Sequence, residues 1–468
     1  MSAEVTADNE NPEATSLPIT YFAGVGENPA LSRVPVFNTN TELAAAIQFL
    51  PDFSPGSDIS VDDRLLIPTI AHRKLFRAIA TSVAGSANER DLSTPEYRAR
   101  VINAFRLINY RRDSHGHNVL STEVCLPNVS TKVHFAVVPN GVGQRAFINA
   151  CQRVFRTEAM LFEVPIEGYA RGARFARMDT IVVPFPPNGN AETFGRELVR
   201  HVSHIFDLRH VLPVMRDGGV ATAMQSVLLA LNVGLVVVGP VSHRMSNATK
   251  AAELWSTLGQ VARATGIPFV IVGTPGAAVS LLGVGDAEAA LTSQGSASIE
   301  LFSLDSRGWD NAAQLVWLKY FWRFGKIPPT WFSAALHAVT LGRIELTMKV
   351  GAYVASLWTV GATPQLSRDI FIAHAHEALR LQKPMLDAVR SARAGGTFSL
   401  GRLRSYSDWL PLSVVVDSVL RLDDGSDVSQ KRFVKDTHSV VRGPKVDQTS
   451  KTQPASEHAD EAVEEAKA

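Results

Sequence analysis

A glycine-containing turn between a short apolar run and a helical pattern is the first feature of this sequence that could do chemistry. The run VVPNGVGQRA, residues 137–146, links a predicted strand at His134–Val138 to a predicted helix at Ala146–Phe155. Backbone N–H groups at a helix start, together with the helix dipole, favour an anion in front of them. The turn therefore predicts a site for a phosphate or a similar group.

One interpretation of the turn is a degenerate P-loop of the form GxxxxGK[ST]. Gly143 matches the second glycine, whereas Val138 stands at the first, Gln144 at the lysine and Arg145 at the hydroxyl residue. The lysine contacts the β- and γ-phosphates and the hydroxyl contacts magnesium. Both replacements therefore remove groups that phosphoryl transfer uses.

Two other interpretations stay open from the turn alone. The pattern Gly141-x-Gly143-x-x-Ala146 fits the dinucleotide fingerprint, and Glu163 ends the next strand near the spacing expected of a ribose-binding acid. In the other interpretation, the turn is a glycine turn that binds nothing.

The end of a later predicted strand bears on ATP hydrolysis. The strand at Gly234–Val238 is followed by Gly239 and Pro240. A P-loop ATPase needs an aspartate here to hold magnesium, and many families add a glutamate that orients water. Because neither Gly239 nor Pro240 has a carboxylate, the sequence predicts no hydrolysis, while dinucleotide binding stays open.

The most concentrated basic stretch within the predicted core contains Arg171, Arg174 and Arg177. Tyr169 and Phe175 lie beside them, and guanidinium groups with aromatic neighbours suit phosphate and sugar contacts to nucleic acid. The alternative is a loop that is basic for solubility. No metal site is predicted, because the histidines at 201, 204, 374 and 376 lack HExxH spacing and have no cysteine nearby.

Alternating strand and helix patterns predict how these residues are positioned. Short apolar runs, each followed by a helical pattern, predict a doubly wound, mostly parallel α/β sheet. The predicted strands are His134–Val138, Met160–Val164, Thr180–Pro184, Gly234–Val238 and Phe269–Gly273, and the helices between them are Ala146–Phe155, Ala191–Phe206, Gly219–Leu231 and Thr249–Thr265. From Trp309 to Ala394 only helical patterns occur, which predicts a separate helical unit.

Composition limits the classes of protein that fit. The chain has 468 residues, of which 46% are hydrophobic and 19% charged, and its net charge is +1. These values allow a sizeable core and exclude a protein that coats nucleic acid through bulk charge. The two cysteines, Cys125 and Cys151, exclude a disulfide scaffold and suit a reducing compartment. The start of the chain is polar and acidic, unlike a secretory signal, so a cytoplasmic protein is expected.

The ordered series of motifs between Thr94 and Ala394 resembles the AAA+ transposition-regulator ATPases of bacterial multi-subunit transposons, the TnsC/TniB type. Residues 135–155 resemble that family's P-loop and following helix, and residues 181–198 its second strand and helix. Residues 234–238 stand where the Walker B strand stands. The run GIPFVIVGT, residues 266–274, resembles the sensor-1 strand, with Thr274 at the sensor-1 position.

The resemblance implies an AAA+ P-loop-type α/β core with a C-terminal helical lid and disordered tails. It also implies an oligomer on double-stranded DNA that links a target-selection protein to a transposase, with an active AAA+ paralogue as a further partner and no membrane. The localisation implied is cytoplasmic and nucleoid-associated. Arg171, Arg174 and Arg177 would face the DNA channel.

The departures from the family pattern predict a pseudo-ATPase that acts as a scaffold. These departures are Gln144, Arg145, Gly239 and Pro240. No cofactor is expected, with weak ATP binding without hydrolysis at Gly141, Gly143, Gln144, Arg145 and Thr274 as the alternative. A function of another class, a weak ATPase or a dinucleotide-binding enzyme that uses Gly141, Gly143 and Glu163, is the competing hypothesis.

The predicted domain boundaries follow from these patterns. They are an N-terminal extension at 1–60, partly disordered, a helical segment at 61–115, the α/β core at 116–305, the helical lid at 306–395, a partner-docking segment at 396–422 and a disordered tail at 423–468.

Overall fold

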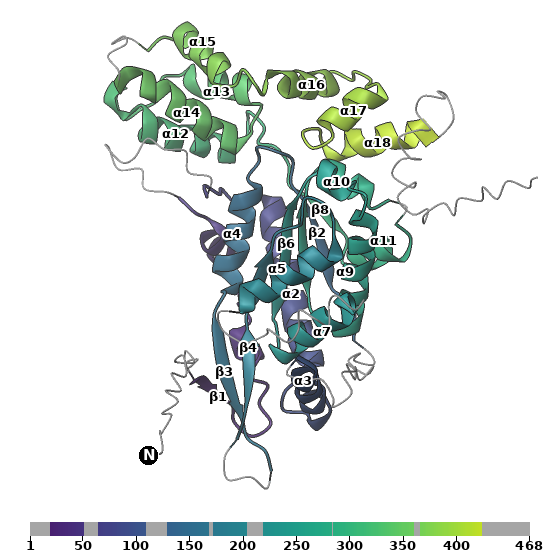
Figure 1. Cartoon of the computed structure of the whole chain (residues 1–468). Helices are drawn as coiled ribbons and strands as arrows, with labels where there is room; N and C mark the ends of the chain where they lie inside the picture. Colours follow the sequence, from purple (N-terminus) through teal and green to yellow (C-terminus); the bar gives the residue numbers. More distant parts are fainter. Residues whose placement is uncertain are drawn as a thin grey trace, which may run out of the picture.

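The computed structural model of the chain describes residues 19–50, 64–108, 129–167, 172–203, 219–282, 284–359 and 366–423. These residues form an α/β core, a small second sheet that projects from one end of the core, and a helical unit at the opposite end (Figure 1). Arg171 of the basic stretch lies outside the described residues, as do most of the two predicted tails.

A five-stranded parallel sheet forms the centre of the core. Its strands lie in the order β5 (Thr180–Val183), β6 (Leu235–Val241), β7 (Phe269–Gly273), β2 (Val133–Val137) and β8 (Ser296–Ser298). Four of these strands coincide with predicted ones, and β8 is an addition. The sequence of β8, Ser-Ala-Ser, has no apolar run by which it could be recognised.

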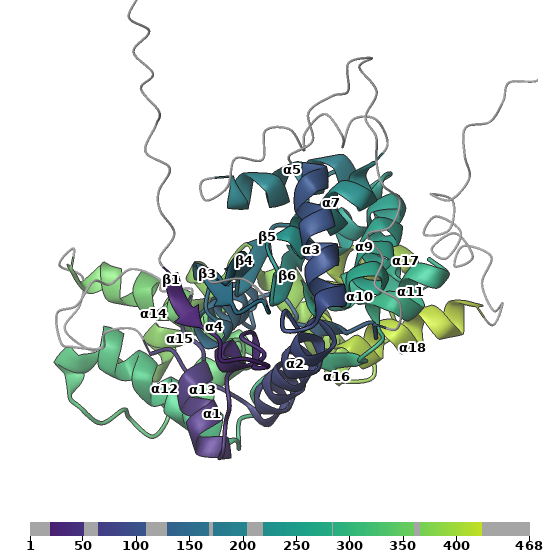
Figure 2. The same cartoon turned by 90° about the horizontal axis from the view of Figure 1, so that it is seen from below.

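Helices cover both faces of this sheet, which confirms the predicted doubly wound α/β class. On one face α1 (Asn40–Ile47), α2 (Ile70–Glu89) and α4 (Gln144–Phe155) share a hydrophobic cluster with alternate strand residues such as Val237 and Val270. The opposite face packs against α3 (Pro95–Ile108), α5 (Ala191–Val202), α7 (Val220–Ala230) and α9 (Ala251–Thr265) through Val236 and Ile271. Figure 2 shows α3 beside α7 on this side.

The small sheet corrects one sequence prediction. The predicted core strand at Met160–Val164 is β3 (Ala159–Val164), and it lies outside the parallel sheet. It pairs in parallel with β1 (Ile19–Phe22) and antiparallel with β4 (Ala173–Met178), and the β3–β4 hairpin projects away from the helical unit (Figure 1). The burial of β3 alternates along the strand, as expected for a strand with only one buried face.

The C-terminal part of the described chain is helical, as its pattern predicts. It consists of α12 (Arg307–Tyr320), α13 (Phe332–Thr340), α14 (Ile344–Thr359), α15 (Arg368–Ala378), α16 (Lys383–Arg393), α17 (Leu400–Tyr406) and α18 (Leu412–Asp423). Trp309 and Trp317 are fully buried here, and Trp317 packs edge-on against Phe332 at 4.9 Å between ring centroids. These two tryptophans are therefore part of the hydrophobic core of the helical unit.

Short helical elements complete the chain. They are η1 (Leu31–Arg33), α8 (His243–Ser246), α10 (Pro275–Ser280), α11 (Asp286–Leu291) and η2 (Trp322–Phe324). Of the helices in the described part of the chain, none combines the length and the apolar character that a bilayer crossing requires.

Candidate functional site

The glycine-containing turn lies at the carboxyl edge of the core sheet, between β2 and α4. Gly141 has φ of 81° and Gly143 has φ of 113°, a region of backbone space that glycine enters without strain. Gly143 caps α4 without a side chain, and its carbonyl accepts the first helical hydrogen bond from Phe147 N at 2.9 Å. The local sequence thus builds a glycine turn that leads directly into a helix N-terminus, the backbone arrangement from which an anion site was predicted.

The side chain of Gln144 is engaged by the turn itself. Its Nε2 donates to the carbonyl oxygen of Val138 at 2.7 Å and lies 3.4 Å from Oδ1 of Asn140. The neighbouring Arg145 is exposed. At the position of the P-loop lysine there is therefore a neutral amide that holds the turn closed, rather than a cation directed at phosphates.

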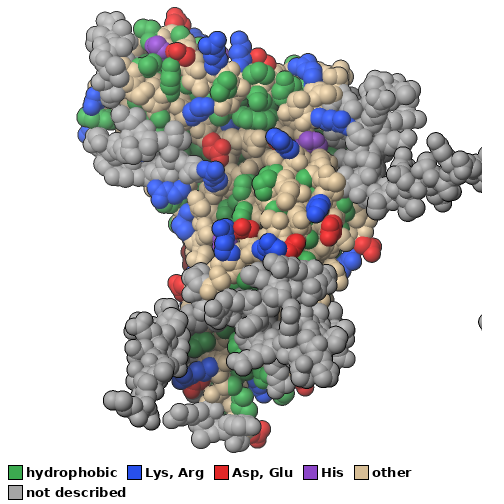
Figure 3. Space-filling model, viewed as in Figure 1, with side chains coloured by type: hydrophobic (Ala, Val, Ile, Leu, Met, Phe, Trp, Pro, Cys, Tyr) green, Lys and Arg blue, Asp and Glu red, His purple; other side chains and the backbone are tan. Residues whose placement is uncertain are grey.

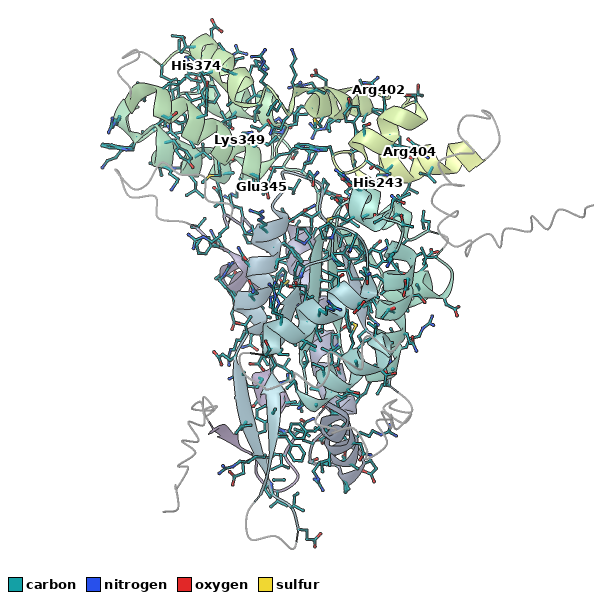
Figure 4. The ribbon with its side chains drawn as sticks, viewed as in Figure 1. His243, Glu345, Lys349, His374, Arg402 and Arg404 are labelled. Carbon is teal, nitrogen blue, oxygen red and sulfur yellow. The ribbon has the colours of Figure 1, made fainter. Side chains whose placement is uncertain are left out.

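The helical unit packs directly on this turn through the start of α14. The Glu345 N–H donates to the carbonyl of Gly141 at 3.1 Å. A Cβ atom placed on Gly141 would lie 3.4 Å from Cδ of Arg343 and 3.5 Å from Cγ of Leu346. Figure 4 shows Glu345 at the junction between the helical unit and the core. The start of α14 therefore contacts the turn directly.

Arg343 is the most unusual residue of this junction, because its guanidinium is fully buried. Nη1 donates to the carbonyl of Asn140 in the turn, and Nη2 donates to the carbonyl of Trp409 at 2.5 Å. The guanidinium carbon also lies 5.1 Å from the centroid of the Trp409 ring. Burial, reinforced by the nearby positive charge of Arg393, lowers the pKa of Arg343 to about 9.

A turn at residues 407–409, between α17 and α18, crosses the same edge of the sheet. The carbonyl of Asp408 accepts a hydrogen bond from the N–H of Asn140 at 2.8 Å. Its carboxylate oxygen Oδ1 accepts from the N–H of His243 at 2.8 Å and from the hydroxyl of Thr274. Asp408 thereby ties together the segments that follow β2, β6 and β7.

The end of β6 carries no acidic side chain, as its sequence shows. The strand continues through Gly239 and Pro240 to Val241, and a Cβ atom on Gly239 would lie 2.6 Å from the carbonyl oxygen of Val272 on β7. No side chain fits at position 239 without moving the neighbouring strand. The Asp408 carboxylate reaches this edge through its hydrogen bonds with the N–H of His243 and the hydroxyl of Thr274.

The predicted DNA-contact residues Arg174 and Arg177 lie in different environments in the structure. Arg177 is 2% exposed, forms an ion pair with Asp179 at 3.3 Å and donates to the carbonyl of Asn232 at 2.7 Å. The prediction that Arg177 contacts DNA is therefore wrong. Arg174 is exposed on β4 but pairs with Glu163 at 3.1 Å, which neutralises part of its charge.

Glu163, the partner of Arg174, is also the acidic residue of the dinucleotide hypothesis. Glu163 lies on β3 in the small sheet, whereas Gly141 and Gly143 lie at the carboxyl edge of the core sheet. The structure does not bring the three residues together, so the fingerprint lacks its acidic partner. Within the described ranges, no three His, Cys, Asp or Glu side chains gather in a way that could hold a metal ion.

The topology around the site determines the fold type. Along the chain, the strands of the core sheet are β2, β5, β6, β7 and β8. The first of these, β2, lies in the sheet between the fourth, β7, and the fifth, β8, and the glycine turn follows β2. A helical unit packs on that turn from the C-terminal side. The fold is of the AAA+ P-loop type.

Comparisons with known proteins add a distant structural likeness. No protein-family model and no curated protein matches the chain. A solved structure of the Aeropyrum pernix ORC2 protein, in ADPNP and ADP complexes, is similar over 66% of this chain and 88% of that one. The sequence identity is 12% and the TM-score is 0.35.

Two residues at the centre of this AAA+-type site, Arg343 and Asp408, are absent from the sequence-based candidates. Asp408 carries one signal, because it is the only acidic residue in the aromatic and basic stretch from Phe398 to Leu410. Arg343 has no such signal, since its partners lie 203 and 66 residues away along the chain.

Replacing Gly276 with valine is expected to displace the 407–409 turn. A Cβ atom on Gly276 would lie 2.7 Å from Cβ of His243 and 2.8 Å from Oδ1 of Asp408. Overpacking of this kind costs about 1–3 kcal/mol of unfolding free energy. Urea unfolding should record the loss, and trypsin should cleave after Arg402 or Arg404 sooner. Gly401→Ala, in open space on α17, is the control, and equal behaviour of both variants would contradict the expectation.

Proposed function

We propose that this chain is a non-hydrolysing AAA+-type scaffold that acts on double-stranded DNA in transposition, between a target-selection protein and a transposase. The observation that carries the non-hydrolysing part of the proposal is that the chain's own groups occupy the carboxyl edge of the core sheet beside the glycine turn. Gln144 closes the turn, Arg343 joins it to the helical unit, and Asp408 engages Thr274 at the sensor-1 position. The part that concerns DNA and transposition rests on the resemblance of the motif order to the transposition regulators.

In this conformation the residues present do not fit a magnesium nucleotide. The Thr274 hydroxyl and the Asn140 N–H, which face the edge of the sheet, are already engaged by Asp408. The Asp408 carboxylate would also repel a phosphate at short range. The proposal includes assembly as an oligomer, with further copies or with an active paralogue. A scaffold that does not hydrolyse ATP would act by holding such neighbouring molecules together.

ATP hydrolysis is expected to be absent. Phosphoryl transfer depends on positioned cations, magnesium and a water-orienting group, and each commonly contributes orders of magnitude in rate. Purified protein with millimolar ATP and magnesium should release no phosphate above the blank, and ATP should leave its melting temperature unchanged. Magnesium-dependent phosphate release that disappears in Gly143→Val protein would contradict the proposal.

A further inference from the structure

One helix of the core, α2, carries a concentration of positive charge, although the whole chain has a net charge of only +1. Residues 64–88, which include all but the last residue of α2, contain four Lys or Arg residues and no Asp or Glu. Three of these four, Arg73, Lys74 and Arg77, lie in the first eight residues of the helix. The rest of the chain is therefore acidic on balance, and the start of α2 is one of its positive regions.

Arg73, Lys74 and Arg77 share the outer face of α2 and are called here the α2 basic face. Residues three or four positions apart are neighbours on a helix, so Arg77 lies beside both Arg73 and Lys74. Lys74 and Arg77 are exposed, and Arg73 is half-buried. The other side of the helix packs into the core through apolar side chains, which are Leu75, Phe76, Ile79 and Val83. Figure 2 shows α2 along the outside of the core.

No carboxylate neutralises the α2 basic face within the described part of the chain. The ion pairs between described residues all involve other cations. Glu89, the one acidic residue of α2, lies at the far end of the helix and pairs with Lys132 at 2.5 Å. The charges of Arg73, Lys74 and Arg77 therefore remain available to a ligand from outside.

The backbone of α2 fixes these side chains and adds to their electrostatic potential. The helix begins with a capping box, in which the Thr69 hydroxyl accepts from the N–H of His72, and it runs for 20 residues. Its dipole places partial positive charge at this N-terminal end, next to Arg73 and Lys74. Because the helix is anchored in the core, a ligand would have to order side chains only, which keeps the entropy cost of binding small.

The outer face of α2 has the composition of a surface for a polar partner. Beyond Arg77 it presents small or uncharged side chains, which are Ala78, Thr81, Ala84, Gly85 and Asn88. Ile70, at the start of the helix, is the one large hydrophobic residue of α2 that is exposed. Protein interfaces centre on large apolar side chains, whereas surfaces that bind the DNA backbone are polar and positive.

We propose that the α2 basic face binds the phosphate backbone of duplex DNA, an inference that rests on the proposed function and names its DNA-contacting face. Arg73 and Arg77 can contact a phosphate in bidentate geometry, and Lys74 can contact one as a point charge. Contacts of this kind read no base edges, so the binding is independent of DNA sequence and weakens as the salt concentration rises.

The α5 helix supplies a matched control on the opposite face of the core sheet. Arg196 pairs there with Glu192 at 2.5 Å, and Arg200 pairs with Glu197. Both arginines are exposed, but each has its own carboxylate. Figure 3 views this face and shows basic side chains next to acidic ones over the core. Replacing the two α5 arginines removes two positive charges without touching the α2 basic face.

The test compares Lys74→Gln/Arg77→Gln with Arg196→Gln/Arg200→Gln in the full chain. Fluorescence anisotropy with a labelled duplex of about 30 base pairs, titrated at several salt concentrations, gives affinity and salt slope. The α2 variant should bind every duplex sequence at least about tenfold more weakly, and its salt slope should fall by about two. Lys74→Arg/Arg77→Lys, which keeps both charges, should retain the wild-type salt slope. The α5 variant should match wild type in affinity and slope.

The outcomes separate this inference from the proposed function. If wild type binds duplex DNA and the α2 variant binds equally well, or if the α5 variant loses as much affinity as the α2 variant, the α2 assignment is wrong while the DNA scaffold stands. If wild type fails to bind duplex DNA even at low salt, the scaffold proposal falls and the α2 assignment falls with it. If wild type binds a poly-glutamate peptide but no DNA, and the α2 variant loses that binding, the surface recognises an acidic protein instead. Melting temperatures of all variants verify folding.

Discussion

Arg343→Ala protein is expected to lose about 3 kcal/mol or more of unfolding free energy. The substitution removes a buried side chain and leaves the carbonyls of Asn140 and Trp409 without their donor. Each buried acceptor left in this way costs about 1–3 kcal/mol, and the cavity adds to the loss. Urea unfolding followed by tryptophan fluorescence measures the change.

Arg393→Ala is the matched control for this prediction. Arg393 is exposed and makes one hydrogen bond, to Leu341, so its removal should cost about 1 kcal/mol or less. Arg343→Met separates side-chain volume from hydrogen bonding, because methionine fills part of the cavity but leaves the Asn140 and Trp409 carbonyls without a donor. We expect Arg343→Met to recover part of the loss. An Arg343→Ala protein as stable as Arg393→Ala would contradict the structural role of this residue.

Acid is expected to destabilise the fold through two buried histidines. Burial lowers the pKa of both His72 and His134 to about 4, against an ordinary value of 6.5. Between these values the unfolded chain binds protons that the folded chain does not, so stability falls as pH falls from 6.5 towards 4. Each histidine would contribute roughly 3 kcal/mol over that window.

The contacts of these histidines suggest isosteric replacements. His72 Nδ1 accepts from Thr69 N–H at 3.2 Å, and His134 Nε2 lies 2.8 Å from the Ser82 hydroxyl. Asn at position 72 and Gln at position 134 place an amide oxygen or nitrogen near those atoms without a titratable ring. Urea unfolding across the pH series should show a flatter profile for His72→Asn/His134→Gln than for wild type. His376→Asn, at an exposed position, should keep the wild-type profile, and parallel profiles for all three proteins would refute the prediction.

The parallel core was predictable because its strands are apolar on both faces. Residues such as Val236, Val237 and Val238 are all fully buried, which an uninterrupted hydrophobic run indicates. The hairpin was not predictable in the same way. Arg174 and Arg177 give β4 the composition of a surface loop, and the burial of Arg177 depends on Asn232, which lies 55 residues away.

The sequence predicted where the backbone of the candidate site lies, but not which side chains contact it. The glycines, Gln144 and Thr274 stand where the motif order places them, at the edge of the sheet. The side chains that engage them come from Arg343 and Asp408, which pattern and spacing cannot connect to a turn at residues 137–146. Long-range contacts of this kind follow from how the helical unit docks, and a single sequence records no direct trace of that docking.

The 407–409 turn has a consequence for the time course of synthesis on the ribosome. The last strand of the core sheet ends at Ser298, and Asp408 is translated 110 residues later. At roughly 5–20 residues per second, the sheet edge is complete for roughly 5–20 s before the residue that closes it exists. Every newly made molecule therefore passes through an interval in which the Thr274 hydroxyl and the His243 and Asn140 N–H groups are not yet covered by Asp408 and are open to small anions or to chaperones.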